Sequence, residues 1–294
     1  MSIKTFQKTV WEFYEKNKRT FPWRDTADPY KILVSEVMLQ QTQTSRVVEK
    51  YQVFLKAFPT IESLAKSPQS KVLKHWQGLG YNRRALFLKK SAEMICNDVL
   101  IHHYKLGVEY LQTLPGIGPN TAGAIVAFAY NKPVVFIETN IRRVFIHSFF
   151  SDSTNVPDSE IFPLIQACLP LPREEQNRST IGGSEFISEG SSRNPEGVSR
   201  DVREWYYALM DYGAYLAKAV QNPNRKSKHY TKQSKFEGSI RQTRGLLIKA
   251  LLKKPMTYEK LMESSNNPHQ LNEALEKLVK EGVISKRGNL YIID

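Results

Sequence analysis

Apolar side chains recur at helical spacing through most of the chain. They repeat every three or four residues in Ile3–Asn17, Tyr30–Gln41 and Pro119–Tyr130, which is the spacing of one buried helix face. The alternating pattern of a strand is nearly absent before Gly282, so we expect a mostly α fold. The same spacing predicts further helices over Ser45–Phe58, Ile61–Ala65, Ser70–Trp76, Tyr81–Val99, Val108–Gln112, Glu138–Phe149, Glu160–Ala167 and Asp201–Lys218.

The pattern changes in the last part of the chain. Helices are predicted over Arg241–Leu252, from Thr257 onward and over Pro268–Glu281, followed by short strands over Val283–Ser285 and Leu290–Ile293. Three helices and a two-stranded hairpin are typical of a winged helix, whose third helix reads DNA when the module binds it. That helix carries three acidic residues here. We therefore favour a packing or partner-binding role for the module.

Two stretches without a helical pattern divide the chain. Residues 171–200 are rich in Ser and Gly, and we expect a mobile loop there. Residues 222–239 have many basic and few apolar side chains, which indicates a basic linker. The predicted organisation is a helical domain over residues 1–221, the linker over 222–239 and the winged-helix domain over 240–294.

The charge of the chain indicates a polyanionic partner. Its 294 residues include 42 Lys and Arg against 29 Asp and Glu, a formal net charge of +13. Residues 222–254 alone hold ten basic residues and one acid, Glu237. Clustered basic side chains neutralise phosphates and release counterions. We therefore expect nucleic acid as the partner.

Membrane and metal classes are disfavoured by the sequence. Apolar runs are too short to cross a membrane, and the first residues lack the apolar core of a signal peptide. We expect no membrane partner and a cytoplasmic, nucleoid-associated location. Cys96 and Cys168 lie far apart and fit no metal-binding pattern, so no metal site is expected.

The run LPGIGPNT, Leu114–Thr121, joins two predicted helices. Gly116 and Gly118 permit a tight turn and let backbone N–H groups approach a ligand closely. Pro119 suits the first turn of the second helix, whose N-terminus attracts an anion. The run predicts a helix–hairpin–helix element that holds one DNA phosphate without reading the sequence.

Several short runs occur together with this hairpin. In this order and spacing they resemble the helix–hairpin–helix DNA glycosylase superfamily, and within it the adenine DNA glycosylase (MutY-type) branch, over roughly Lys4–Lys218. The resemblance implies two helical subdomains around a cleft and a monomer that excises a mismatched adenine, opposite 8-oxoguanine or guanine, from duplex DNA. The runs are FPWR (Phe21–Arg24), DPY (Asp28–Tyr30), SEVMLQQTQ (Ser35–Gln43), GLGY (Gly78–Tyr81), PGIG (Pro115–Gly118) and ETNIRRV (Glu138–Val144).

Two carboxyl groups are candidates for the chemistry. Cleavage of an N-glycosidic bond needs a protonated leaving base and a stabilised sugar cation, and an acid with a carboxylate can supply both. Glu36 lies in an otherwise apolar helix, which favours its protonated form, and the matching family residue protonates the adenine ring. Glu138 begins a helix, where the dipole favours an anion, although the family normally has Asp there. Asn140 resembles a residue that supports this carboxylate.

The resemblance implies roles for other residues of these motifs. Asn120 stands where strand-cutting relatives have the Lys that forms a Schiff base, so we expect a monofunctional glycosylase without efficient lyase activity. Gln41 resembles a side chain that enters the base stack beside the flipped nucleotide. Around the flipped base we expect Trp23, Arg24, Leu39, Asn120 and Tyr207. Contacts to DNA are expected from Gln40, Gln41, Thr42, Tyr81, Asn82, Arg83, Gly116, Gly118, Thr121 and Arg142.

The sequence departs from the family where cofactor and substrate are concerned. The family usually binds an iron–sulfur cluster with four Cys after the segment matching Asp211–Ala214, but Tyr215–Lys235 contains none. We expect no cluster, and at most a monovalent cation at the Leu114–Gly118 hairpin. The predicted winged helix stands in place of the family's domain that senses 8-oxoguanine. Asn82 stands in place of an aromatic wedge near the opposite base, and Tyr207 in place of a Gln or Glu near the adenine.

Two other functions stay open at this point. A glycosylase for thymine or uracil opposite guanine would also lack the Lys, and its pyrimidine leaving group needs less ring protonation. A non-catalytic DNA-binding adaptor would explain Glu138 in place of Asp. The presence of Glu36, Gln41 and Asn140 favours the enzyme over the adaptor.

Overall fold

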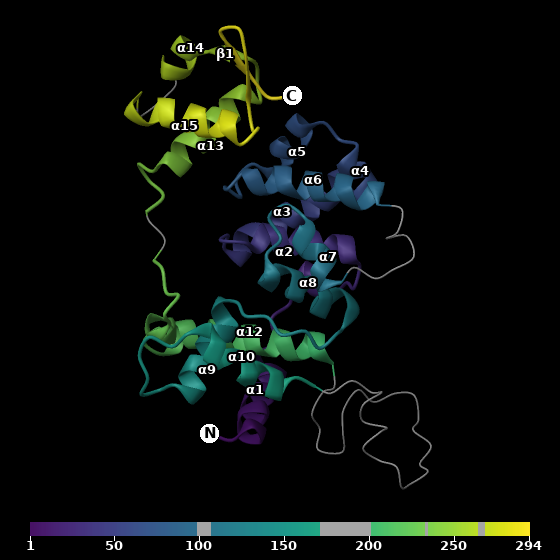
Figure 1. The fold of residues 1–294 in the computed structure, drawn as a ribbon, viewed down its shortest axis with the longest axis vertical. Coiled ribbons are helices and arrows are strands. Elements are labelled where there is room, and N and C mark those ends of the chain that lie inside the picture. The colour runs from purple at the N-terminus through teal and green to yellow at the C-terminus, as the bar shows by residue number, and fades with distance from the viewer. Residues whose placement is uncertain (99–106, 171–200, 233–234, 264–267) are drawn as a thin grey trace. The chain divides into compact units, whose positions relative to one another are not determined.

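The computed structural model describes residues 1–98, 107–170, 201–232, 235–263 and 268–294. They are mostly helical (Figure 1) and form two compact units. The first unit contains Met1–Ala27 and Pro119–Lys232, and the second contains Asp28–Gly118 and Gln233–Asp294. The loop predicted over 171–200 lies outside the described residues.

Helices of the first unit pack around an aromatic core. The ring of Phe6 lies 5.0 Å from that of Phe145 and 6.1 Å from that of Trp205, measured between centroids. These side chains come from three helices, so burial of their rings holds α1, α9 and α12 together. The elements are α1 (Ile3–Asn17), η1 (Pro22–Arg24), α8 (Pro119–Tyr130), α9 (Thr139–Phe149), α10 (Asp158–Cys168), α12 (Val202–Ala219) and η3 (Pro223–Lys226).

The second unit has its own core. Phe54, Phe58 and Trp76 are fully buried there, and the hydroxyl of Tyr30 donates to the carbonyl of Phe58 at 2.8 Å. Seven of the eleven residues of α2 are buried, which explains its continuous apolar sequence. The elements of this part are α2 (Pro29–Leu39), α3 (Thr44–Ala57), α4 (Ile61–Ala65), α5 (Gln69–Trp76), α6 (Arg83–Asn97) and α7 (Val108–Thr113).

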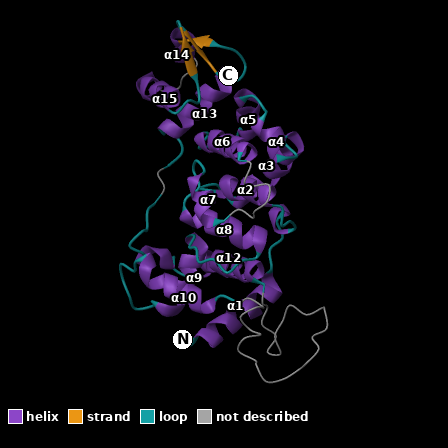
Figure 2. Cartoon of the chain, turned by 45° about the vertical axis from the view of Figure 1, so that its right-hand side comes forward, coloured by secondary structure: helices purple, strands orange, loops and turns teal. Residues whose placement is uncertain are grey.

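The winged helix forms the rest of the second unit. Its three strands, drawn as orange arrows in Figure 2, are antiparallel in the order β1-β3-β2. The Gln69 side chain donates to the carbonyl of Gly282 at 3.0 Å, and the N–H of Ser70 donates to that of Asp294 at 2.7 Å. The module is therefore bonded to α5. Its elements are α13 (Ile240–Leu251), β1 (Met256–Thr257), α14 (Tyr258–Glu263), α15 (Pro268–Lys280), β2 (Ser285–Arg287) and β3 (Leu290–Ile292).

The predicted helices are confirmed within two residues at each described end, and the two-residue differences at α2 and α6 have a local cause. The helix predicted to Gln41 ends at Leu39, and the one predicted from Tyr81 begins at Arg83, because Gln41 and Tyr81 adopt φ values of +54° and +46°. Left-handed backbone cannot continue an α-helix. The strand predicted over Val283–Ser285 lies at Ser285–Arg287 instead, and β1 escaped prediction because it has two residues.

The segment interpreted as a basic linker is bonded to the first unit at its beginning. The N–H of Val156 donates to the carbonyl of Lys226 at 2.8 Å, and the N–H of Lys228 donates back to Val156 at 2.9 Å. The domain boundaries at 221 and 239 stay predictions. Every described helix is too short or too polar to span a membrane.

Candidate functional site

Glu138 is the N-cap of α9. Its Oε1 accepts the backbone N–H groups of Asn140 at 2.7 Å and Ile141 at 2.8 Å, and its Oε2 accepts from the Asn140 side-chain amide at 3.2 Å. Shorter Asp and Asn side chains usually make such bonds. The extended backbone of Glu138, with φ −125° and ψ 177°, lets its longer side chain fold back to the same donors. The extra methylene is absorbed, and the carboxylate lies at the positive end of the helix.

The environment of Glu138 acts on its ionisation in two directions. Burial raises its pKa, whereas the two backbone hydrogen bonds and the charges of Arg143 and Arg142 lower it, and the net shift is upward. All of these polar partners are donors or cations, so they stabilise the ionised form. The carboxyl group therefore loses its charge at a higher pH than that of an ordinary Glu.

Asn140 is held in turn by Arg143, which the sequence analysis missed. Nη1 of Arg143 donates to Oδ1 of Asn140 at 2.6 Å and to the carbonyl of Gly213 on α12 at 2.7 Å. A Cβ placed on Gly213 would lie 2.7 Å from Cβ of Asn140, so α12 can approach α9 here only because this residue is Gly. The sequence signal for this close helix contact was a glycine inside a predicted helix.

The turn η3 completes this network. The side-chain amide of Asn224 donates to the carbonyl of Thr139 at 2.9 Å, and Nε of Arg143 donates to Oδ1 of Asn222 at 3.3 Å. Asn224 is buried. The segment just after α12 therefore supports the first turn of α9, where Glu138 lies.

Asn120 lies at the exposed start of α8. Its Oδ1 accepts the N–H of Ile137 at 3.1 Å, and Ile137 precedes Glu138 in the chain. The two predicted site residues Asn120 and Glu138 are thus linked through one backbone group. The side chain at this position is an amide, which is no nucleophile.

Three residues predicted near the flipped base form one buried cluster in the first unit. Both terminal nitrogens of Arg24 donate to Asp211, at 2.9 and 2.8 Å, and its guanidinium lies 4.5 Å from the ring centroid of Tyr207. Trp23 stacks on Phe21 with centroids 5.1 Å apart. Arg24 is therefore paired inside the protein, and it supports the aromatic ring of Tyr207.

Glu36 belongs to the second unit, near the end of α2. It is half-buried, and its neighbours Ser35 and Val37 are buried. Leu39, also half-buried, ends the helix. Gln40, four residues after Glu36, is the C-cap that follows α2. A carboxyl group thus emerges from an apolar helix beside the loop that carries Gln40.

Arg84 fixes this loop and was also missed from the sequence. Its Nη1 donates to the carbonyls of Val37 at 2.7 Å and Gln40 at 2.6 Å, and its Nη2 donates to Oγ1 of Thr42 at 2.9 Å and to the carbonyl of Gly80 at 3.2 Å. Burial lowers the pKa of Arg84 to about 10. A buried cation at the C-terminal end of α2 interacts favourably with the helix dipole. Its hydrogen bonds also join the loop at Gln40 to the loop at Gly80. Of the predicted DNA contacts, Thr42 thus has an internal partner.

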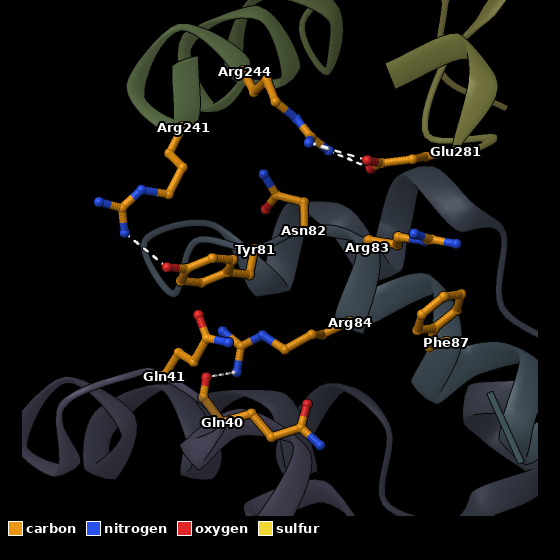
Figure 3. Close-up of a pocket in the computed structure, with 10 residues that line it drawn as sticks. All are labelled: Gln40, Gln41, Tyr81, Asn82, Arg83, Arg84, Phe87, Arg241, Arg244 and Glu281. Carbon is orange, nitrogen blue, oxygen red and sulfur yellow. Dashed lines mark hydrogen bonds and ion pairs between the residues drawn. The ribbon is translucent and has the colours of Figure 1, made fainter. Parts of the chain in front are cut away.

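Five predicted DNA-contacting residues line one pocket of about 280 Å³ in the second unit (Figure 3). Arg241 and Arg244 of α13 and Glu281 lie across from them. No sequence signal connects α13 with these loops. The five are Gln40, Gln41, Tyr81, Asn82 and Arg83.

The predicted phosphate-binding hairpin is tied to the same loop. The side-chain amide of Gln40 donates to the carbonyl of Gly116 at 3.2 Å. Gly116 has φ +76°, and a Cβ there would lie 2.7 Å from a ring carbon of Phe87, so only Gly fits. Gly118 is exposed, and a Cβ on it would meet nothing within 4 Å. The surface of the hairpin before Pro119 is open to a ligand.

Two further predicted DNA contacts lie in the first unit. Arg142 donates to both carboxylate oxygens of Asp158, with Nε to Oδ1 at 2.7 Å, so its charge is paired within the protein. Thr121 is half-buried on α8. Among the described residues, no cluster of three His, Cys, Asp or Glu side chains could bind a metal.

The structure thus gathers the predicted residues in two groups. Those of the second unit are Glu36, Leu39, Gln40, Gln41, Thr42, Tyr81, Asn82, Arg83, Gly116 and Gly118, and those of the first unit are Trp23, Arg24, Asn120, Thr121, Glu138, Asn140, Arg142 and Tyr207. Their catalytic and binding roles stay predictions.

Similarity to known proteins identifies the family. Residues 34–163 match the HhH-GPD superfamily of base excision DNA repair proteins. The adenine DNA glycosylase of Mycolicibacterium smegmatis is 30% identical over 295 residues, covering 97% of this chain and 94% of the relative. That of Buchnera aphidicola is 37% identical over 159 residues, 53% of this chain but only 44% of the relative. A thermostable thymine-DNA glycosylase has a similar structure, with a TM-score of 0.56 and 24% identity over 76% of this chain and 91% of that one.

The chain belongs to the HhH-GPD superfamily of base excision DNA repair proteins, in its adenine DNA glycosylase branch. The predicted family and the predicted mostly helical fold are confirmed. The likeness to the thymine-DNA glycosylase concerns the fold.

Gly213→Ala should destabilise the first unit. The added methyl group must push α12 away from Asn140, and overpacking of this kind costs about 1–3 kcal/mol. Gly245→Ala on α13 is the matched control, because a Cβ there meets nothing within 4 Å, and it should preserve or slightly raise stability. Urea unfolding and thermal melting of both variants measure the difference. Equal stability of Gly213→Ala and the wild type would contradict the close approach.

Proposed function

We propose that this protein is a monofunctional adenine DNA glycosylase that hydrolyses the N-glycosidic bond of an adenine mismatched with 8-oxoguanine or guanine in duplex DNA. It acts as a monomer on the DNA of the nucleoid. The observation that carries the proposal is the Glu138 carboxylate, fixed at the N-terminus of α9 by the N–H groups of Asn140 and Ile141. Membership of the family and the names of the relatives support adenine as the base.

The reaction divides the work between the two carboxyl groups. Glu36 donates its proton to a ring nitrogen of the adenine, and the bond between C1′ and N9 breaks with its electron pair passing to the base. The Glu138 carboxylate stabilises the positive charge that develops on the sugar. Water then adds to C1′ and gives up a proton, which restores a carboxylic acid and leaves an abasic site.

Side chains around these groups would bind the flipped nucleotide. Trp23 and Tyr207 would border the extruded base from their buried cluster, and Arg24 holds the Tyr207 ring in place. Leu39 adds an apolar contact at the end of α2. The open hairpin at Gly118 and the start of α8 would hold a backbone phosphate through N–H groups.

The support for Glu138 comes from protein atoms alone in this proposal. Asn222 and Asn224 bond to Arg143 and Thr139 in the segment where the family usually has its cluster. The carboxylate is then positioned without iron. We further propose a monovalent cation at the Leu114–Gly118 hairpin.

Glu36→Gln should abolish base release while leaving DNA binding intact. The amide cannot donate the proton, and loss of a general acid costs about 10²- to 10⁴-fold in rate. Single-turnover cleavage with alkali workup is measured on duplexes with A opposite 8-oxoguanine, A opposite G, T opposite G and U opposite G, and Kd by fluorescence anisotropy. Glu49→Gln, an exposed carboxylate on α3, is the control.

Other outcomes of this panel would replace the proposal. Release of thymine or uracil but no adenine would assign a pyrimidine mismatch glycosylase. Binding without release from any duplex by the wild type would assign a DNA-binding adaptor. Full activity of Glu36→Gln would remove that residue from the mechanism.

Borohydride should trap no covalent complex between the wild-type protein and its product DNA. A Schiff base requires an amine, and residue 120 is Asn. Asn120→Lys places an amine at the start of α8 and should give a trapped adduct that is visible by denaturing electrophoresis. Efficient trapping by the wild type would show that another amine attacks the sugar.

The purified chain should contain no iron and show no visible absorption band of an iron–sulfur cluster. The stretch that follows α12 lacks Cys, and a cluster is held by Cys thiolates. Metal analysis after anaerobic purification, with the absorption spectrum, checks this. A stoichiometric amount of iron would overturn the proposed support for Glu138.

A further inference from the structure

Two arginines stand side by side at the start of α6, and their surroundings differ. Arg84 is buried and donates to backbone carbonyls of two loops. Arg83 is exposed. Within the part of the chain that the structure describes, its guanidinium has no carboxylate and no carbonyl as a partner. The charge of Arg83 is therefore available to a ligand, whereas the charge of Arg84 serves the fold.

The Phe87 ring, one turn further along α6, supports the guanidinium of Arg83. Cζ of Arg83 lies 4.6 Å from the centroid of this ring. In Figure 3 the Arg83 side chain extends over Phe87 and away from Tyr81. An aromatic face attracts a guanidinium without using its N–H donors. Phe87 thus fixes the place of the charge and leaves it unneutralised.

The Phe87 ring also lies against the hairpin Pro115–Gly118. A Cβ placed on Gly116 would be 2.7 Å from Cδ2 of Phe87, so the ring and the turn are in direct contact. The Gln40 amide holds the same turn by donating to the carbonyl of Gly116 at 3.2 Å. One aromatic ring therefore separates Arg83 from the hairpin.

We propose that Arg83 binds a DNA phosphate next to the one held by the hairpin, and that Phe87 is the residue that positions Arg83 for this contact. The inference rests on the proposed function, in which the hairpin binds the DNA backbone. Each strand of B-DNA carries one phosphate per roughly 3.4 Å of helix axis. Phosphates beside the one in the hairpin thus come within reach of a guanidinium that lies one ring away. The planar fork of an arginine matches two phosphate oxygens.

A grip on two neighbouring phosphates would fix the direction of the strand as well as its position. Such contacts carry no sequence information. Extrusion of a nucleotide rotates it about its own backbone, so a strand held at two points gives that rotation a fixed support. Arg83 and the hairpin would therefore act on any lesion in the same way.

The same helix offers a matched control in Lys90. This residue is exposed and lies two turns after Arg83, on the same face of α6. Its Nζ is 3.6 Å from Oε2 of Glu93, and Glu93 also pairs with Lys89. The charge of Lys90 is thus balanced within the protein, unlike that of Arg83.

The first test measures the salt dependence of DNA binding. The probe is a duplex with a tetrahydrofuran abasic analogue opposite guanine, and Kd is measured by fluorescence anisotropy over a series of KCl concentrations. The proteins are the wild type, Arg83→Ala and Lys90→Ala, each checked by thermal melting. The probe has no base to release, so a failure of the proposed catalysis would leave this result readable.

We expect Arg83→Ala to lower the slope of log Kd against log[KCl] by about 0.9, the value for one phosphate contact. Lys90→Ala should keep the slope of the wild type. An unchanged slope in Arg83→Ala, or an equal decrease in both variants, would overturn the proposal.

The second test asks whether Phe87 acts through Arg83. Phe87→Leu keeps an apolar side chain against the hairpin and removes the aromatic face. It should raise Kd about two- to fivefold in the wild-type background, which is the size of an exposed cation–π contact. It should have no effect in the Arg83→Ala background. No change in either background, or equal weakening in both, would contradict the positioning role.

The third test locates the phosphate. Duplexes carry one neutral methylphosphonate at successive positions of the strand with the abasic analogue. The wild type should lose affinity at two adjacent positions, and Arg83→Ala should become insensitive at one of them while the other keeps its effect. If Arg83→Ala changes the sensitivity at a distant phosphate, or at none, Arg83 does not bind beside the hairpin.

Discussion

The candidate site depends on one constraint, the fixation of a carboxylate at the start of a helix. Glu138 accepts two backbone N–H groups and the amide of Asn140. These donors and the helix dipole stabilise the anion although burial opposes it. A Glu in place of the shorter Asp keeps this arrangement because the extended backbone absorbs the added methylene. The substitution therefore does not argue for an inactive protein.

Support for that carboxylate extends over three elements of the first unit. Arg143 joins Asn140 to α12, and Asn224 joins the first turn of α9 to η3. Gly213 allows the helices to approach closely enough for these bonds. A buried guanidinium is stable only when its donors are satisfied, so the network has to form as a whole. The first turn of α9 is thus held by amides and one arginine.

In the second unit, two arginines hold the loops in which Gln41 and Tyr81 have left-handed backbone. Arg84 bonds to the carbonyls at the end of α2, and Arg241 bonds to Tyr81 from a helix much later in the chain. The winged helix is therefore part of the unit that carries Glu36, and it need not read DNA by itself. A module that usually binds DNA through its third helix here completes a pocket with its first.

The sequence by itself determined the helices, the hairpin and the family. Apolar periodicity is a local property, so α1 and α8 were predicted to the residue, and the glycines of the hairpin report a local turn. Tertiary structure alone decided the partners of the charged groups. Arg241 and Tyr81 are 160 residues apart in sequence, and Arg24 meets Asp211 across 187. No short-range pattern encodes such pairs, because they form only when packing brings distant elements together.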